Sequence, residues 1–539
     1  MGEIRPKRLR VGVLVDSPWI TQWQLTSLEQ CEDLIELVAV VNCTNSTRRR
    51  HLFRHFAYYV LSAICLRGRQ TKSVPWAPLI NDRCEIVDFE CQTVGKWQIL
   101  GDQVRSRIGA LNLDVIVRFG MNLIRDAETL PVTHGILSFH HGDPTMYRGR
   151  PAGFYEILDD ASHVGVIVQE LSNKLDAGQI RAIGRYRLER HSYKKTMDHV
   201  FSSGTRLLRT ALKNCSTDKS IPLETSSKSF QLPSNVIVIR FLFTLLLRKA
   251  FRLIQGLFVR RKWEISIADS KQLDIAHSSI VLDELTSFST PGGLEFIADP
   301  FTLADGVIVC EAMPRRRATG RLMTITGDTS SFVDTKGFSQ GKHLSFPFVV
   351  VHEGTTYILP EMAQSGPQAL CELDSMHSIR ETVILQGLEN DRLIDPVLHF
   401  DQGRWWLFAG KAGLEADHLF LWFSDQITGP YEPHPLNPVV TNPASARNAG
   451  PILNIGNQYF RTGQNNRRQY GNGVTLNLIV QLDTDTYEEE FVASIRAAER
   501  CGPHTLSIVG GRLLIDSYKL QLDLFAWLPR VLERTRWKR

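Results

Sequence analysis

The chain has 539 residues, 43% hydrophobic and 22% charged, which is long enough for two or more globular domains with their own cores. Its net charge of +5 at pH 7 is small for this length and argues against a dedicated nucleic-acid-binding protein. The nine cysteines are scattered without metal-ligand spacing, which indicates reduced thiols in a cytoplasmic protein and predicts no metal site.

The first third of the chain alternates short apolar runs with segments of helical periodicity. Residues 9–15, 34–42, 115–120 and 136–140 predict strands, and residues 19–31 predict a helix. Continuous apolar strands alternating with helices are typical of a doubly wound parallel α/β sheet, whose ligands bind beyond the carboxyl ends of the strands. No long apolar stretch precedes the first strand, so we expect no secretory signal.

Polar residues and glycines follow the strand at 136–140 in a recognisable order. They form a histidine, a Tyr-Arg-Gly turn, a strand containing glycine and a Leu-Asp-Ala-Gly turn, on Ser138, His140, Tyr147, Arg148, Gly149, Gly165, Asp176 and Gly178. This order resembles the active-site segment of the folate-dependent formyltransferases, whose catalytic residues are an Asn, a His and an Asp. The resemblance assigns catalysis to His140 and Asp176, with Ser138 at the position of the Asn.

The resemblance implies transfer of a formyl group from 10-formyltetrahydrofolate to an amine. His140 would stabilise the oxyanion, and Asp176 would orient the His140 side chain. The apolar loop after the strand at 115–120 would bind the folate through Phe119, Gly120, Met121, Asn122 and Leu123. Gly178, in the Leu-Asp-Ala-Gly turn, would contribute to the same site. Ser138 offers one hydroxyl in place of an amide. Three alternatives follow: slow transfer, transfer helped by a water or a neighbouring group, or binding without catalysis.

Two neighbouring residues carry separate predictions. His141 follows His140 directly, and adjacent strand residues point to opposite faces, so we expect His141 to have a structural role. Asp143 stands at a position that is apolar in the formyltransferases, which makes it a candidate contact for a polar substrate.

The middle of the chain is basic and apolar. Residues 216–233 are rich in Ser and Thr and predict a linker. The apolar run within residues 235–263 is interrupted by Arg240, Arg248, Lys249 and Arg252, which leaves it too short and too charged for a transmembrane helix. The segment predicts a basic amphipathic helix at an anionic membrane surface. Residues 48–69 have a similar composition. The alternative is that both segments pack their apolar sides against the domains. We therefore expect a cytoplasmic protein, attached peripherally to the inner face of the membrane under the first alternative.

The C-terminal half contains a repeat. A dipeptide ending in Pro precedes a strand, a glycine-containing turn and a second strand at Asp299-Pro300, Phe346-Pro347, Asp395-Pro396, Gly450-Pro451 and Gly502-Pro503. The prolines are 47, 49, 55 and 52 residues apart. Five such units of about 50 residues predict an all-β five-bladed propeller.

The segments ADPF, SFPF, YILPE, ARNAG, YFRTGQN and GPHTL resemble the N-terminal domain of plant glucosamine inositolphosphorylceramide transferases, from about residue 263 to 518. The repeats also resemble the propellers of furanosidase-type glycoside hydrolases. The glycosyltransferase domain of the plant proteins has no counterpart here, so glycosyl transfer is not implied. The repeat places six polar residues near one mouth of the propeller: Asp299, Glu311, Glu361, Asp395, Arg447 and His504. They would hydrolyse a glycosidic bond, bind a sugar, or only shape the turns.

Taken together, the sequence predicts a multidomain protein. A Rossmann-like α/β formyltransferase domain at 1–214 is followed by a linker with a basic helix at 215–263 and by the propeller at 264–539. The predicted function is formyl transfer to an amine, with an amino sugar of a glycolipid or polysaccharide precursor as the expected acceptor. The alternative is a glycan-binding or glycan-processing propeller protein whose first domain is catalytically impaired. A tRNA substrate is disfavoured, because the C-terminal half is unlike a basic tRNA-binding barrel.

Overall fold

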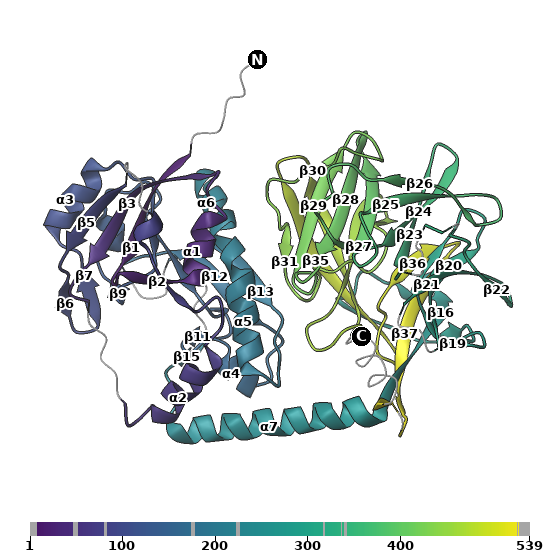
Figure 1. The fold of residues 1–539 in the computed structure, drawn as a ribbon, viewed down its shortest axis with the longest axis horizontal. Coiled ribbons are helices and arrows are strands. Elements are labelled where there is room, and N and C mark those ends of the chain that lie inside the picture. Colours follow the sequence, from purple (N-terminus) through teal and green to yellow (C-terminus); the bar gives the residue numbers. More distant parts are fainter. Residues whose placement is uncertain are drawn as a thin grey trace, which may run out of the picture. The chain divides into compact units, whose positions relative to one another are not determined.

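The computed structural model describes residues 8–46, 52–79, 84–173, 178–222, 227–315, 319–335, 337–338, 342–524 and 526–527. The chain forms two compact units, Met1–Arg248 and Lys249–Arg539 (Figure 1). The division falls inside helix α7 (Asn235–Phe258), within the segment that the sequence predicts as a linker with a basic helix. The prediction of a multidomain protein is confirmed.

The first unit is built on an eight-stranded sheet with the order β14-β13-β12-β10-β8-β1-β3-β5. Its strands are β1 (Leu9–Val15), β3 (Ile35–Cys43), β5 (Glu85–Phe89), β8 (Val115–Arg118), β10 (Ile136–His140), β12 (Val164–Glu170), β13 (Gln179–Tyr186) and β14 (Ile221–Pro222). The strands from β10 to β5 run parallel, whereas β12, β13 and β14 are added antiparallel. Parallel strands of this kind require cover on both faces.

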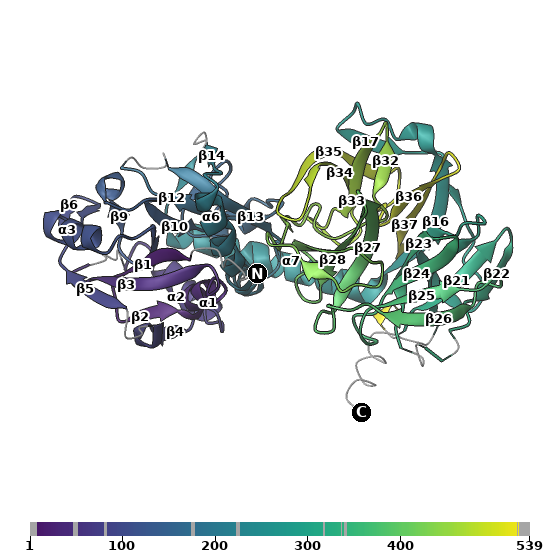
Figure 2. The same cartoon turned by 90° about the horizontal axis from the view of Figure 1, so that it is seen from above.

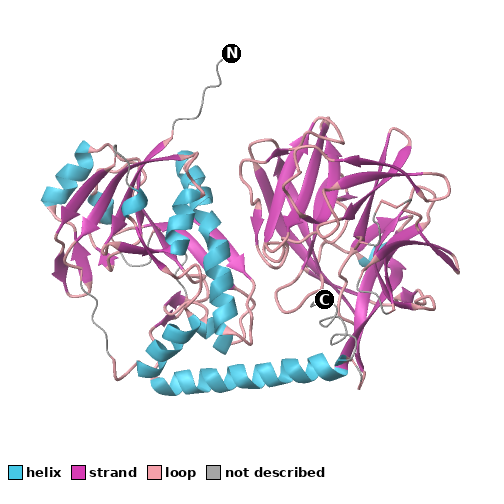
Figure 3. Ribbon diagram, in the orientation of Figure 1, coloured by secondary structure: helices cyan, strands magenta, loops and turns pink. Residues whose placement is uncertain are grey.

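Helices supply that cover, and Figure 3 shows them in cyan around the magenta strands. Successive residues of β1 enter different cores: Val13 belongs to the cluster that includes residues of α6 and α7, and Leu14 belongs to the cluster that includes residues of α3. The helices are α1 (Gln22–Glu29), α2 (Phe56–Cys65), α3 (Asp102–Ala110), α4 (Phe154–Leu158), α5 (Tyr193–Ser203), α6 (Leu207–Ser216) and α7. Short strands complete the unit: β2 (Trp19–Thr21) with β4 (Ser73–Pro75), β6 (Gln92–Val94) with β7 (Trp97–Ile99) and β9 (Leu123–Ile124), and β11 (Arg148–Gly149) with β15 (Ser229–Phe230). Single 3-10 turns are η1 (Ala77–Leu79), η2 (Ala127–Thr129), η3 (Gly204–Arg206) and, in the second unit, η4 (Ser270–Gln272).

The described part of the second unit contains five sheets of four or five strands, which Figure 2 shows from above. Three follow in chain order: β19 (Leu294–Thr302), β20 (Ile308–Pro314), β21 (Arg321–Thr326) and β22 (Thr329–Phe332); β23 (Ser345–His352), β24 (Thr355–Glu361), β25 (Ala369–Leu373) and β26 (Ile379–Ile384); and β27 (Leu393–Asp401), β28 (Arg404–Lys411), β29 (His418–Ser424) and β30 (Glu432–Pro433), with β31 (Val440–Thr441) beside β29. The fourth has the order β17 (Ser279–Leu282), β35 (Tyr487–Ala497), β34 (Val474–Leu482), β33 (Gln458–Gln464) and β32 (Leu453–Ile455). The fifth has the order β18 (Thr286–Ser287), β16 (Val259–Asp269), β37 (Arg512–Leu522) and β36 (Leu506–Val509).

The fifth sheet joins the two ends of the unit. Its strand β16 comes first in the unit and β37 comes last, and the two pair antiparallel from Val259 opposite Leu522 to Asp269 opposite Arg512. All five predicted strand-turn-strand units are present, as β19–β20, β23–β24, β27–β28, β32–β33 and β36–β37.

The residue before proline has a left-handed backbone in every repeat. The φ angles are 51° at Asp299, 42° at Phe346, 46° at Asp395, 145° at Gly450 and 131° at Gly502. At the first three positions the strand register also shifts, as in a β-bulge. A left-handed residue other than glycine costs about 1–2 kcal/mol, so the surroundings of the two aspartates must stabilise this conformation.

Candidate functional site

Four of the predicted propeller residues meet in one buried network of the second unit. Arg447 donates from Nε to Asp395 Oδ2 at 2.5 Å and from Nη2 to Oδ1 at 3.3 Å. Its guanidinium lies 5.1 Å from the ring centre of Tyr470, and the rings of Tyr470 and His504 are 4.6 Å apart. His504 Nδ1 lies 3.1 Å from Asp299 Oδ1. The network therefore runs without interruption from Asp395 to Asp299.

Asp516 anchors one end of this network. Its carboxylate accepts hydrogen bonds from the backbone amides of Asp299, His504 and Thr505, and its Oδ2 lies 3.2 Å from His504 Nδ1. The left-handed turn at Asp299 is thus held by a side chain from the last strand. The ligand atoms of Asp299, His504 and Asp516 are near enough to bind one metal ion. Because donors already occupy both Asp516 oxygens, the three residues fit a charged hydrogen-bond network better than a cation site.

His504 is a cation at neutral pH. Burial opposes its positive charge, but the carboxylates of Asp516 and Asp299 outweigh burial and raise the pKa of His504 to about 10. The pKa of Asp516 is lowered: burial opposes its ionisation, and the charge and hydrogen bond of His504 overcome it. The two side chains therefore stabilise each other in the charged form.

The other carboxyl groups of the network hold their protons more tightly than usual. Burial, followed by repulsion from neighbouring carboxylates, raises the pKa of Glu311 and of Glu361 well above the ordinary value. Burial also raises the pKa of Asp299, although His504 opposes this shift. These three residues are only 5–7% exposed. Perturbed carboxyl groups of this kind are typical of ligand-binding and catalytic sites.

Sequence reasoning missed several partners in this network. Gln464 Nε2 donates to Asp395 Oδ2 at 2.9 Å, and Asn448 Nδ2 donates to the Asp395 carbonyl at 2.8 Å. Asn448 and Gln464 lie inside the motifs that carried the family resemblance. A polar residue within a strand that is otherwise predicted to be buried could have indicated Gln464, which is 0% exposed in β33.

In the first unit, Ser138, which stands at the Asn position of the formyltransferase pattern, is hydrogen-bonded to an arginine. Ser138 of β10 is in register with Arg118 of β8, and Arg118 Nε donates to Ser138 Oγ at 3.1 Å. Arg118 Nη1 donates to the carbonyl of Asn122 at 2.5 Å. The sequence analysis did not single out Arg118. A charged residue at the end of an apolar strand could have indicated it.

The predicted pairing of His140 with Asp176 stays a prediction, because Asp176 lies outside the described residues. His140 is half-buried at the end of β10.

His141 packs edge-on against Trp23 and Phe201, with ring centres 5.1 and 5.0 Å away. Burial, with a smaller contribution from His140, lowers the pKa of His141 to about 3. His141 is therefore a neutral packing residue, as expected from the sequence.

Asp143 uses its hydrogen-bonding capacity inside the protein. It is 2% exposed and accepts hydrogen bonds from the Thr145 amide and hydroxyl, and its Oδ2 lies 3.4 Å from His163 Nε2 and 3.5 Å from Arg185 Nε. Burial opposes its ionisation, but these partners keep the pKa of Asp143 below its ordinary value. The proposed contact with a polar substrate finds no support in these interactions.

The loop predicted to bind folate packs onto the domain core. Met121 is 4% exposed and its amide donates to Asp16 at 2.8 Å. The Asn122 amide donates to the Gln98 side chain, Phe119 packs on Trp23, and Leu123 of β9 pairs with Trp97 of β7. The loop lies at the carboxyl end of β8, as predicted, and its folate-binding role stays a prediction.

The glycines of the motif are explained by close backbone approaches. A Cβ atom would lie 2.4 Å from the Asp16 nitrogen at Gly120, 2.6 Å from the Asp143 Cβ at Gly165 and 2.0 Å from the Glu170 carbonyl oxygen at Gly178. These distances exclude any side chain without backbone movement, so packing accounts for these glycines.

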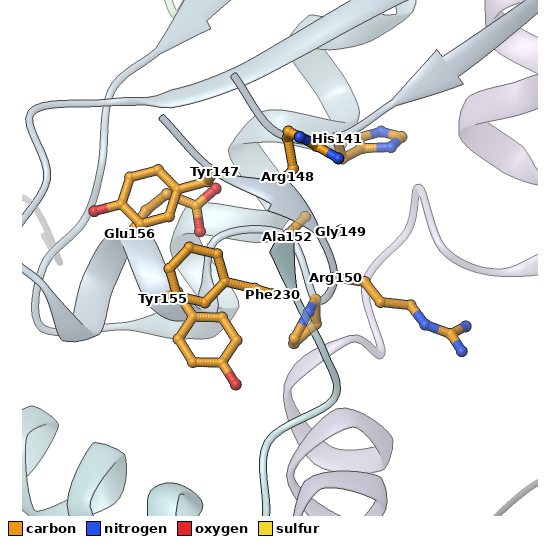
Figure 4. A pocket seen from close by; sticks show the side chains of 10 residues that line it. His141, Tyr147, Arg148, Gly149, Arg150, Ala152, Tyr155, Glu156 and Phe230 are labelled. Carbon is orange, nitrogen blue, oxygen red and sulfur yellow. The ribbon is translucent and has the colours of Figure 1, made fainter. Parts of the chain in front are cut away.

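A small pocket of the first unit lies beside the Tyr-Arg-Gly turn (Figure 4). It is lined by His141, Tyr147, Arg148, Gly149, Arg150, Pro151, Ala152, Tyr155, Glu156 and Phe230. Figure 4 shows the Glu156 carboxyl group beside the Tyr147 ring. Burial raises the pKa of Glu156 to about 7 and that of Tyr147 to about 12. Glu156 therefore changes charge near neutral pH in a pocket, which makes it a candidate binding residue.

The family comparison concerns the second unit. Residues 262–505 match the family model "Glucosamine inositolphosphorylceramide transferase 1, N-terminal". The protein of that name from Oryza sativa subsp. japonica is 29% identical over 219 residues, covering 37% of this chain and 28% of the relative. The one from Arabidopsis thaliana is 26% identical over 236 residues, covering 39% and 29%. The chain thus spans less than a third of the length of these relatives. The predicted resemblance of the second half is confirmed.

Among solved structures, the α-L-arabinofuranosidase of Podospora anserina has 11% identity and a TM-score of 0.31, covering 43% of this chain and 93% of its own. A formyltetrahydrofolate deformylase of Pseudomonas putida has 15% identity and a TM-score of 0.27, covering 41% and 69%. An N-formyltransferase of Helicobacter canadensis has 12% identity and a TM-score of 0.27, covering 46% and 82%. Likenesses this remote carry no argument about function.

The prediction that the chain is a formyltransferase is wrong. The curated relatives are named glucosamine inositolphosphorylceramide transferases, which is a different type of transfer. In the predicted catalytic segment, the Ser138 hydroxyl that was expected to replace the amide donor donates instead to the Phe139 carbonyl at 3.4 Å and accepts from Arg118. The expectation of a glycolipid-type acceptor agrees with the relatives' name. Use of 10-formyltetrahydrofolate stays a prediction.

Proposed function

We propose that the second unit binds the amino sugar of a glycolipid-type molecule and that the protein acts in glycolipid processing. The observation that carries the proposal is the buried network of carboxyl groups at Asp299, Glu311, Glu361 and Asp395. The name of the curated relatives, which contains both glucosamine and inositolphosphorylceramide, supports the chemical class of the ligand.

The charge balance of the network favours a cationic ligand. Arg447 neutralises Asp395, and His504 is matched by Asp516. Asp299, Glu311 and Glu361 remain in excess, and burial with mutual repulsion raises the pKa of each. An ammonium group placed among them would favour their ionised forms, whereas sugar hydroxyls would donate to their oxygens. A hexosamine supplies both kinds of group.

We also propose that the five sheets form the blades of a closed propeller. Support comes from the pairing of β16 with β37 and from the repeated left-handed residue before proline. In such an architecture the bulges of several blades deliver side chains to one shared mouth. Asp299 and Asp395 both lie at these bulges.

Calorimetric titration with glucosamine, N-acetylglucosamine and glucose tests the ligand. We expect glucosamine to bind about tenfold more tightly than the other two, because a charge-assisted hydrogen bond contributes about 1.5–3 kcal/mol. Binding should release protons, seen as a dependence of the heat on the ionisation enthalpy of the buffer. Asp299→Asn and Glu361→Gln should remove the preference for glucosamine.

Glu381→Gln is the matched control, because Glu381 is exposed on β26 of the same unit. The proposal fails if acetylated and free amino sugars bind equally. It also fails if glucosamine binding releases no protons, or if Glu381→Gln weakens binding as much as Glu361→Gln does.

A further inference from the structure

Two segments of the chain are basic and lack acidic residues altogether. Residues 37–81 and 225–263 together hold 15 of the 62 Lys and Arg residues and none of the 57 Asp and Glu residues. The chain as a whole has a net charge of +5, so everything outside these segments is net acidic. Such charge asymmetry indicates that the two segments face a negatively charged partner. They contain helices α2 and α7.

Helix α7 has apolar side chains on two opposite faces. One face packs into the first unit through Val238, Phe241 and Leu245, and Phe241 stacks on Phe154 with ring centres 4.1 Å apart. The opposite face is exposed, with exposed fractions of 75% at Val236, 65% at Ile239, 60% at Phe243, 62% at Leu246, 54% at Leu247 and 54% at Ile254. Helical periodicity places these six on one side. A helix that only packs on a domain carries polar residues there.

Helix α2 begins beside the start of α7 and also has an exposed apolar side. Asn235, at the start of α7, accepts a hydrogen bond from the Ala57 amide at 2.9 Å and donates to the Phe53 carbonyl at 3.0 Å. The beginnings of the two helices therefore lie together, as Figure 1 also shows. Exposed apolar residues recur at helical spacing in and just before α2: Phe53 at 97%, Phe56 at 63%, Val60 at 42% and Ile64 at 67%. Isolated exposed apolar residues are ordinary, but a patch spanning two helices marks an interaction site.

We propose that this surface, the α2–α7 face, docks in the plane of an anionic lipid membrane. Exposed basic residues flank the apolar side chains, as Arg54 beside α2 and as Arg240 and Lys249 in α7. Among the helices of the described part of the chain, none combines the length and hydropathy needed to cross a bilayer. An apolar face with basic flanks inserts its side chains among lipid headgroups while its charges contact anionic phosphates. A second copy of the chain fits less well, because pairing two such faces would bring like charges together.

Sedimentation with vesicles tests the proposal. The full-length protein should bind vesicles of phosphatidylcholine with 30% phosphatidylserine and bind pure phosphatidylcholine vesicles far less. Arg54→Glu, Arg240→Glu and Lys249→Glu combined should reduce binding by at least about tenfold, and high salt should have the same effect. Ile239→Gln, Phe243→Gln and Leu246→Gln combined should also reduce binding. All six residues are exposed, so the melting temperature should stay near that of the wild type.

A matched charge control comes from the second unit. Lys271→Glu, Arg496→Glu and Arg512→Glu combined make the same change in net charge at exposed positions, and they should leave vesicle binding unchanged. The proposal is overturned if this control loses binding equally, or if the protein stays in the supernatant with anionic vesicles at low salt. It is also overturned if the wild type is a dimer that the apolar variant converts to monomer without any vesicle binding. Because these tests use no sugar ligand, their failure leaves the proposed amino-sugar site untouched.

Discussion

His504 Nδ1 lies 3.2 Å from Asp516 Oδ2, and both side chains are buried. His504 lies just before β36 and Asp516 lies in β37, yet Asp516 also accepts a hydrogen bond from the backbone amide of Asp299, in the first repeat. A single carboxylate therefore fixes both a cation and the turn that presents a candidate ligand-binding residue.

The first prediction concerns the pH dependence of this pair. The pKa of His504 is raised to about 10 from an ordinary 6.5, so its contribution to stability is complete below pH 6.5 and is lost as the pH rises through 10. Asp516→Asn should destabilise the protein by about 3–5 kcal/mol at pH 6, since it leaves a buried charge without its partner. The difference from the wild type should shrink at pH 10. Urea unfolding at both pH values measures it, with the exposed Asp425→Asn as control. An equal difference at both pH values would contradict the assignment.

The second prediction concerns Arg447 and Asp395, which are joined by two hydrogen bonds. Asp395→Leu and Arg447→Met should each cost about 3–5 kcal/mol, because each leaves one buried charge unpaired. The double variant should cost clearly less than the sum of the two. A double-mutant cycle by chemical unfolding gives the coupling energy. Additive losses would mean that the two side chains act independently.

The third prediction concerns Glu156 in the pocket of the first unit. The pKa of Glu156 is raised from 4.5 to about 7 by burial, so the folded protein should lose about 3 kcal/mol of stability as the pH rises from 4.5 to 7. Glu156→Gln removes the ionisation and keeps an oxygen that can accept backbone hydrogen bonds. The variant should be more stable than the wild type at pH 8 and similar at pH 4.5. Thermal unfolding across this range measures the crossover, and parallel curves would refute it.

The fourth prediction concerns the backbone before proline. Gly450 has a φ angle of 145°, and a Cβ atom there would lie 2.2 Å from the Leu506 carbonyl oxygen. Gly450→Ala should therefore destabilise the second unit by more than about 2 kcal/mol. Gly292→Ala is the matched control, because nothing lies within 4 Å of the added carbon. Similar melting temperatures for the two variants would show that the turn at Gly450 relaxes.

Local patterns in the sequence predicted much of the fold. The strands at 9–15 and 136–140 are found at the predicted residues, because continuous apolar β-branched runs have few alternatives in a parallel sheet. The segment at 19–31 was harder, since it begins as strand β2 and becomes helical only at Gln22. There, pairing with β4, more than 50 residues away, overrides helical periodicity.

The candidate site was predicted less completely than the fold. Asp299, Asp395, Arg447 and His504 were identified because each lies within four residues of a repeat proline. Asp516 was missed, because its role depends on a hydrogen bond from the Asp299 amide in another repeat, which no local pattern encodes. Arg118 was missed for a similar reason: its partner Ser138 is a neighbour only through the sheet register.

The pairing of β16 with β37 has a consequence for the order in which the second unit matures. While the chain is being synthesised, β16 leaves the ribosome about 250 residues before its partner strand exists. Until then it presents an unpaired strand edge, next in sequence to the exposed apolar residues of α7. During this part of synthesis, the nascent chain therefore exposes a strand edge and apolar side chains to which chaperones can bind. A stop codon before residue 512 would remove β37, and β16 would then remain without this partner strand.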